Sequence, residues 1–182
     1  MNVLIIGGCG YVGSAIGKHL ADKHEITNID LEWFGNHSYA HTINMDYNDC
    51  TPKFLDKFNV VILTAGHSSV KMCDTDLQSS FNNNVRNFVN LTSKLTTQKF
   101  IYASSASVYG NTSDTDLAED NVNFSPINYY DMTKLHIDHI MHLSPLDYYG
   151  LRFGTVNGPA PSMRTDVMIN AMVNTAMQKG EI

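Results

Sequence analysis

The sequence predicts an α/β fold in which helices cover both faces of a doubly wound parallel sheet. Short apolar runs alternate with helical patterns along the chain, which is the order of elements that produces parallel strands. The runs are apolar throughout, as expected of strands buried on both faces. No repeat, low-complexity segment or linker interrupts this order, so we expect residues 1–182 to form one domain.

The first expected strand is the β-branched run NVLII at residues 2–6, which glycines end. The helix expected at 11–23 follows, with Val12, Ile16 and Leu20 at helical spacing on its apolar side. The next expected strands are EITNID at 25–30, HTINMD at 41–46 and NVVILTAG at 59–66. In sheets of this kind ligands bind at the carboxyl ends of the strands, so residues that end strands are site candidates.

The second half of the chain begins with a long helix expected at 76–95 and a strand at 99–105. A helix at 125–143 follows, for which Ser125 and Pro126 form a suitable N-cap and first-turn pair. The apolar side of the long helix consists of Phe81, Val85, Phe88, Val89 and Leu95. The last expected elements are a strand at 147–154 and a helix at 165–180, which Gly180 ends.

The composition excludes several classes of function. Hydrophobic residues make up 43% and charged residues 16% of the chain, as in a folded globular protein. The net charge of −6, without clustered Lys and Arg, argues against nucleic acid and anionic membranes as partners. The N-terminal apolar run is too short to span a bilayer and lacks a basic leader, so we expect a cytoplasmic protein. The three scattered cysteines argue against a disulfide framework and a zinc site.

A glycine-rich loop, GGCGYVG, lies between the first strand and the first helix. Gly7 suits a tight turn, Gly10 lets the backbone approach a pyrophosphate, and Gly13 lets the helix pack closely on the sheet. The helix N-terminus adds free N–H groups and a positive dipole for phosphates. An isolated pattern of this kind can be a simple tight turn, but its place between a strand and a helix predicts Rossmann-type dinucleotide binding.

A carboxylate at the end of the second strand indicates which dinucleotide binds. Asp30 lies seventeen residues after Gly13, where a carboxylate can accept hydrogen bonds from the adenosine ribose. The residues that follow it, LEWFGN, include no Arg or Lys to bind a 2′-phosphate. The sequence therefore predicts NAD, and not NADP, as the cofactor.

The stretch NYYDMTKLH, at 128–136, contains a candidate base. Tyr130 and Lys134 are four residues apart and share one face of a helix, whereas Tyr129 points elsewhere. An ammonium near a tyrosine favours the phenolate, so we expect the pKa of Tyr130 to be lowered. Taken alone the spacing is weak evidence, because helices carry such pairs by chance.

Several motifs in a fixed order give this pair a context: GGCGYVG, then YASSASVYG, then YYDMTK, then LRFGTVNGP. In this order they resemble the extended short-chain dehydrogenase/reductase family, specifically its NAD-dependent nucleotide-sugar epimerase/dehydratase group, and the chain looks UDP-glucose 4-epimerase-like. The resemblance covers residues 2–180. It implies a nucleotide-sugar substrate, most often a UDP-sugar, with NAD as the cofactor.

The resemblance implies catalytic roles for Ser105, Tyr130 and Lys134. Tyr130 would remove a hydroxyl proton of the sugar as hydride passes to NAD⁺, Ser105 would donate a hydrogen bond to the substrate oxygen, and Lys134 would hold the nicotinamide ribose. Beyond the glycine loop and Asp30, it implies cofactor contacts for Tyr11, Val12, Asp46, Tyr47, Ala65, Gly66, Asn84, Ala103, Ser104, Phe153 and Val156. It implies substrate contacts for Ser105, Ser107, Thr155, Arg164 and Asn170. Phe153 has a core position as its alternative, and Ser107 a turn cap.

Epimerases and dehydratases of this group share a 4-keto sugar intermediate. Dehydratases usually carry an Asp-Glu pair where this chain reads SASVYG, so the resemblance favours an epimerase. The chain departs from the family at Asn157, where most members have tyrosine, and it stops at KGEI where members continue. We therefore expect 153–182 to begin a shortened substrate-binding region. A non-catalytic NAD-binding remnant or regulatory module is the alternative, as is a nucleotide-sugar dehydratase or reductase.

The family often pairs through its two long helices, here 76–95 and 127–142, so we expect a homodimer. Phe81, Phe88 and Ile137 are the candidate seam residues, although helices on a sheet need apolar faces in any case. Three histidines recur every third residue on the second helix, but their faces drift around the helix, so we expect no metal site. They are His136, His139 and His142.

Overall fold

A computed structural model describes residues 1–111, 119 and 124–180. Its centre is a sheet of six parallel strands in the order β3-β2-β1-β4-β5-β6. Because β1 pairs with both β2 and β4, the chain winds outward in both directions from it, which confirms the predicted Rossmann-type doubly wound fold. The strands are β1 (Asn2–Ile6), β2 (Glu25–Asp30), β3 (His41–Asn44), β4 (Val60–Leu63), β5 (Lys99–Ser105) and β6 (Tyr148–Phe153).

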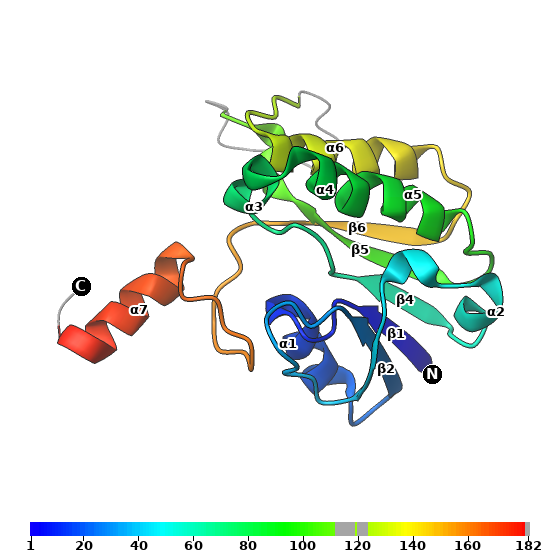
Figure 1. Cartoon of the computed structure of the whole chain (residues 1–182), viewed down its shortest axis with the longest axis horizontal. Coiled ribbons are helices and arrows are strands. Elements are labelled where there is room, and N and C mark those ends of the chain that lie inside the picture. The colour runs from blue at the N-terminus through cyan, green and yellow to red at the C-terminus, as the bar shows by residue number, and fades with distance from the viewer. Residues whose placement is uncertain (112–118, 120–123, 181–182) are drawn as a thin grey trace.

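Helices cover the two faces of the sheet unequally, as Figure 1 shows. On one face lies α1 (Tyr11–Leu20), and on the other lie α3 (Val70–Thr75), α4 (Leu77–Phe81), α5 (Asn87–Thr92) and α6 (Tyr129–His142). The short α2 (Pro52–Leu55) precedes β4, and α7 (Met168–Lys179) stands apart from both layers at the end of an extended segment (Figure 1).

Each central strand is apolar throughout because its residues point alternately into two cores. Leu4 and Ile6 pack in the larger core under α5 and α6, whereas Val3 and Ile5 pack in a smaller core under α1. The larger core also takes two residues that were expected at a homodimer seam. Those expectations are wrong: Phe88 and Ile137 are only 1% and 2% exposed, because they cover the sheet. They are unavailable to a second chain.

The expected helix at 76–95 is interrupted and ends at Thr92. Asp76 caps α4, and a π-helical turn at Asn82–Arg86 separates α4 from α5. A π turn accommodates one extra residue, which a 3.6-residue period cannot reveal. Sequence reasoning also missed α2 and α3, which are too short to show a period.

The helix expected at 125–143 begins later, and Ser125 is not its N-cap. Asn128 caps α6: its side-chain oxygen accepts a hydrogen bond from the backbone N–H of Asp131 at 2.9 Å, and its side-chain nitrogen donates to the Asp131 carboxylate at 2.7 Å. This reciprocal pair satisfies the first turn. The other expected elements are confirmed with shifted ends, and Gly180 ends α7 with a φ of 75°.

Candidate active site

A cleft of about 1310 Å³ runs along the carboxyl ends of the strands. The loops after β1, β2, β4 and β5, the start of α6 and the segment after β6 surround it. Predicted site residues that line it are Gly7, Gly10, Tyr11, Val12, Gly13, Asp30, Tyr47, Ala65, Gly66, Ala103, Ser104, Ser105, Ser107, Tyr130, Lys134, Phe153, Thr155, Val156 and Arg164. Asp46, Asn84 and Asn170 lie outside its lining.

The glycine loop shapes one end of the cleft. Gly7 has a φ of 89°, and a side chain there would overlap the backbone of Ala65. A side chain at Gly13 would overlap the carbonyl of Gly7, so α1 packs directly against the loop. Gly10 caps α1, and the first residues of this helix line the cleft, where its unpaired N–H groups begin. The loop therefore fits the pyrophosphate of a dinucleotide.

Asp30 ends β2 beside this loop, and its carboxylate is fixed by two backbone groups. Cys9 N–H donates to Oδ2 at 2.9 Å, and Glu32 N–H donates to Oδ1 at 2.7 Å. Each oxygen keeps a lone pair for a further donor such as a ribose hydroxyl. The cleft residues that follow Asp30, from Leu31 to His37, include no Lys or Arg. This end of the cleft suits the unmodified ribose of NAD.

Sequence reasoning missed two rings that face each other in the cleft. Trp33, after β2, and His67, after β4, make an edge-to-face contact with ring centroids 5.4 Å apart. Asn83 donates to Nδ1 of His67 at 3.2 Å, which leaves the ring proton on Nε2. Burial lowers the pKa of His67 and keeps it neutral. Two adjacent aromatic residues in LEWFGN could have drawn attention to Trp33. Nothing in the local spacing of the sequence indicates that Trp33 meets His67.

Three residues with implied catalytic roles meet at the end of β5. The hydroxyl of Ser105 lies 2.8 Å from the hydroxyl of Ser107, and Ser105 is close enough to Tyr130 to act on the pKa of its phenol. The ammonium of Lys134 lies 5.8 Å from the centre of the Tyr130 ring and donates to the carbonyl of Ala103 at 2.7 Å. It is Ser105 that caps the turn here, with Ser107 N–H as its donor, so Ser107 is not the cap.

The expectation that the pKa of Tyr130 is lowered is wrong. Burial raises the pKa of Tyr130, and the polar interaction with the Ser105 side chain offsets this only in part. Lys134 is itself buried, and this lowers its pKa to about 8. Both groups are thus held toward their neutral forms. The phenolate of Tyr130 therefore depends on positive charge close to it.

Asp46 and Asn84 serve the protein's own backbone. Asp46 accepts a hydrogen bond from Asn48 N–H at 2.8 Å and caps the turn after β3. Asn84 is buried in the π turn and bonds to both backbone groups of His67, at 2.8 and 3.0 Å, and to the Thr133 hydroxyl at 3.1 Å. Asn84 thereby fixes the loop after β4 that forms the cleft wall.

Asn170 ties the C-terminal segment to the start of α1. Its amide donates to the Tyr11 hydroxyl at 3.0 Å and to the Arg164 carbonyl at 2.8 Å, and it accepts from Gly158 N–H at 2.9 Å. The Tyr11 hydroxyl donates to the Gly158 carbonyl at 2.7 Å. Arg164 faces the cleft as one half of a two-bond ion pair with Asp166, at 2.7 and 2.9 Å. The segment after β6 is thus anchored at the glycine loop.

In residues 1–111, 119 and 124–180, no three His, Cys, Asp or Glu side chains are grouped so that they could hold a metal ion. Over the same ranges, none of the helices has the length and apolar content to cross a membrane. Two of the three histidines on α6 contact nearby residues of the chain. His136 bonds to the Met132 carbonyl at 2.6 Å, and His139 packs edge-on against Phe124. The three cysteines are buried and unpaired.

A doubly wound sheet whose cleft joins a glycine-rich loop to a Ser-Tyr-Lys group is typical of a dinucleotide-dependent domain of the short-chain dehydrogenase/reductase type. Residues 3–182 match the model of the NAD dependent epimerase/dehydratase family, and the chain belongs to this family. The resemblance drawn from the motifs is thereby confirmed. The NAD dependence of the family also confirms the predicted cofactor.

Three relatives that match nearly all of this chain are themselves longer than it. Protein CapI of Staphylococcus aureus is 30% identical over 202 residues, covering 96% of this chain and 60% of the relative. UDP-glucose 4-epimerase of Lactobacillus helveticus is 26% identical, covering 87% and 52%. The solved structure of UDP-N-acetylglucosamine 4-epimerase from Methanobrevibacter ruminantium M1 superposes with a TM-score of 0.84 at 27% identity, covering 99% of this chain and 63% of that one. The chain spans about half to three fifths of these relatives.

Proposed function

We propose that this chain carries the NAD site and the reactive residues of a nucleotide-sugar epimerase that acts on a UDP-sugar. The observation that carries the proposal is the meeting of Ser105, Tyr130 and Lys134 in the same cleft as the glycine loop. Membership of the epimerase/dehydratase family supports the reaction class, and the UDP-sugar epimerases among the relatives support the substrate class.

Tyr130 is the proposed base. Its raised pKa keeps the hydroxyl protonated until positive charge next to it favours the phenolate. Ser105, in the same cleft, is placed to hold the substrate oxygen that loses its proton. The Lys134 ammonium and the bound cofactor supply the positive charge that favours the phenolate. NAD supplies the hydride acceptor when bound, through contacts with the glycine loop, Asp30 and Lys134. Each group then has one role in removing a proton and a hydride from a sugar carbinol.

The remaining substrate contacts belong to the segment after β6. Thr155 and Arg164 line the cleft there, and Asn170 fixes the Arg164 backbone. We place the start of the substrate-binding region at 153–182. The turn at 105–110, beside Tyr130, contains no Asp or Glu, which supports an epimerase over a dehydratase.

The proposal is tested by incubating the purified chain and NAD⁺ with UDP-, GDP- and dTDP-sugars and separating the products by chromatography. Conversion of one sugar to its 4-epimer is the expected result. Clear NAD⁺ binding without any conversion would instead indicate the non-catalytic NAD-binding module. Loss of water from the sugar would indicate a dehydratase.

Changing Tyr130→Phe removes the proposed base while keeping the ring. We expect turnover to fall by at least about 100-fold. NAD⁺ binding, measured by calorimetry, should remain close to that of the unmodified chain. Tyr129→Phe is the matched control, because the neighbouring ring is exposed and does not line the cleft. Equal turnover in both variants would show that Tyr130 is not the base.

We further propose a homodimer in the cytoplasm, with the exposed side of α4, α5 and α6 as its seam. Phe81, Val89 and Met132 are large apolar residues exposed on these helices. The ring of Phe81 packs edge-on against His136, which joins α4 and α6 into one surface. Phe81 thus keeps the seam position expected from the sequence, while Phe88 and Ile137 lie beneath it in the core.

A further inference from the structure

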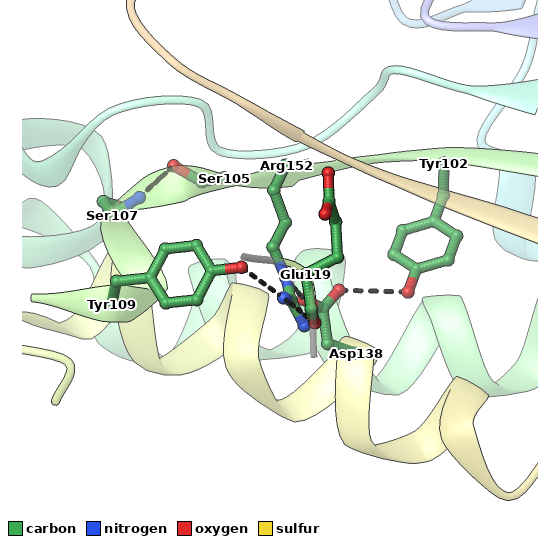
Figure 2. Close-up of polar contacts among 7 residues, drawn as sticks. All are labelled: Tyr102, Ser105, Ser107, Tyr109, Glu119, Asp138 and Arg152. Atoms are coloured by element: carbon green, nitrogen blue, oxygen red, sulfur yellow. Dashed lines mark hydrogen bonds and ion pairs between the residues drawn. The ribbon is translucent and has the colours of Figure 1, made fainter. Parts of the chain in front are cut away.

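One turn along α6 from Lys134, Asp138 belongs to an ion cluster that the proposed chemistry does not use. Figure 2 shows this cluster. Asp138, on α6, is its centre. Arg152, on β6, donates from Nε to one carboxylate oxygen of Asp138 at 2.8 Å. The Tyr102 hydroxyl, on β5, donates to the other oxygen at 3.0 Å. Arg152 also donates from Nη1 to the Tyr109 hydroxyl at 2.6 Å.

The cluster is rigid. The guanidinium of Arg152 lies 5.2 Å from the ring centre of Tyr109 and 5.0 Å from that of Phe124. Both oxygens of Asp138 have fixed donors, and Asp138 is only 8% exposed. The Asp138 carboxylate is therefore held in one place by its ion pair with Arg152 and its hydrogen bond from Tyr102.

Lys134 and Asp138 are four residues apart on the buried side of α6, and both are 8% exposed. The bond that Lys134 makes is to the neutral carbonyl of Ala103, which provides no countercharge. From α3 the thiol of Cys73 faces it, and burial raises the pKa of that thiol, so Cys73 is neutral. Asp138 is the charge that raises the pKa of Lys134 against the effect of burial.

The other groups around this pair do not replace Asp138. Tyr130, on the same helix, has a raised pKa, and so does Tyr102 on β5, so both are neutral. Arg152 is positive and forms an ion pair with Asp138 from β6, so its charge opposes the effect of Asp138 on Lys134. One buried carboxylate thus acts on the Lys134 ammonium through its charge and holds the partly exposed guanidinium of Arg152 through an ion pair.

We propose that Asp138, held by Arg152 and Tyr102, is a positioning residue that acts through Lys134 by keeping the buried ammonium charged. This role rests on the proposed function, because the charge of Lys134 matters to catalysis only if Lys134 serves the reaction. The charge coupling itself needs neither substrate nor cofactor. It can therefore fail or hold independently of the proposed function.

The test is a pH titration of the Lys134 ε-carbon by NMR in the whole chain labelled with ¹³C-lysine, assigned with Lys134→Arg. Asp138→Asn should lower the pKa of Lys134 by about one unit or more, because it removes the negative charge. Arg152→Met should raise it, because it removes the opposing positive charge. A merely structural role would move the pKa in the same direction in both variants, and that result would overturn the proposal.

The controls separate charge from folding. Asp138→Glu restores the charge and should bring the pKa of Lys134 back toward its original value. Asp147→Asn removes an exposed carboxylate that pairs with Lys99 at 3.2 Å, and should leave Lys134 unchanged. If Asp138→Asn alone unfolds, the double variant Asp138→Asn with Arg152→Met removes both charges. Lys134 should titrate at a lower pKa there than in Arg152→Met alone, and equal pKa values in these two variants would overturn the proposal.

Activity gives a second readout. In Asp138→Asn the fraction of charged Lys134 falls, so kcat should decline at a lower pH than in the unmodified enzyme while the KM for the sugar stays the same. Shifted titrations in a chain that converts no sugar would leave the charge coupling intact and overturn only the epimerase proposal.

Discussion

The choice between NAD and NADP depends on one carboxylate. Asp30 is held by the N–H groups of Cys9 and Glu32, and the cleft residues that follow it offer no cation to a 2′-phosphate. We expect calorimetric titration to show NAD binding at least about tenfold more tightly than NADP. Asp30→Asn should narrow this difference because it removes the repulsion of the phosphate. Tighter binding of NADP by the unmodified chain would contradict the assignment.

At the scale of residues, spacing within one element was readable from the sequence. Gly7 and Gly13 belong to one loop, and Tyr130 and Lys134 to one helix turn, so their relative positions follow from local geometry. The pKa of Tyr130 was not readable, because burial by distant segments outweighs the neighbouring lysine. The contact between Trp33 and His67 could not be predicted for the same reason, because their two loops meet only once the sheet has formed.

At the scale of elements, the π turn between α4 and α5 determines how the cleft wall is held. Asn84 bonds to the N–H and the carbonyl of His67. Replacing it leaves the N–H buried without a partner and leaves the carbonyl only the weak bond from the Cys73 thiol at 3.8 Å. Asn84→Ala should lower the free energy of unfolding by about 2 to 4 kcal/mol, measured by urea denaturation. Asn82→Ala, in the same turn but only half-buried, is the matched control and should cost under about 1 kcal/mol. Equal losses would show that the clamp contributes nothing.

Strands and long helices were predictable because their apolar patterns repeat, whereas their ends depended on individual side chains. The Asn128 and Asp131 pair starts α6, and its N-x-x-D spacing was present in the sequence beside the competing Ser125. The break after α4 left no comparable signal. Residues 82–84 are three consecutive asparagines that continue any helical pattern equally well, and the bond from Asn84 to His67 forms only between distant segments of the folded chain.

At the scale of the whole molecule, the two faces of the sheet differ in cover. The larger core lies under α5 and α6, whereas α1 covers the opposite face chiefly at β1 and β4. On β6, Tyr149 and Leu151 point away from the larger core and are exposed. The apolar pattern of the central strands predicted that helices cover them on both faces. It could not predict that one face of β6 lacks a covering helix, because this depends on the position of α7, which stands apart from the sheet (Figure 1).

The unequal cover leaves two candidate surfaces for self-association, and the proposed homodimer uses the one over α4, α5 and α6. Phe81 is 50% exposed there, and Val89 lies further along the same layer. We expect the chain to sediment as a dimer at micromolar concentration. Phe81→Asp with Val89→Asp should convert it to a folded monomer, since each buried anchor lost from an interface costs about 2 kcal/mol of association free energy.

Tyr149→Asp is the control for this prediction, because it places the same charge on the opposite face of the sheet, where Tyr149 is 52% exposed. This variant should remain dimeric in analytical ultracentrifugation. If Tyr149→Asp dissociates the dimer and the Phe81 and Val89 changes do not, the chain associates through the open end of the sheet at β6. In that case the exposed apolar residues of α4 and α5 have another role.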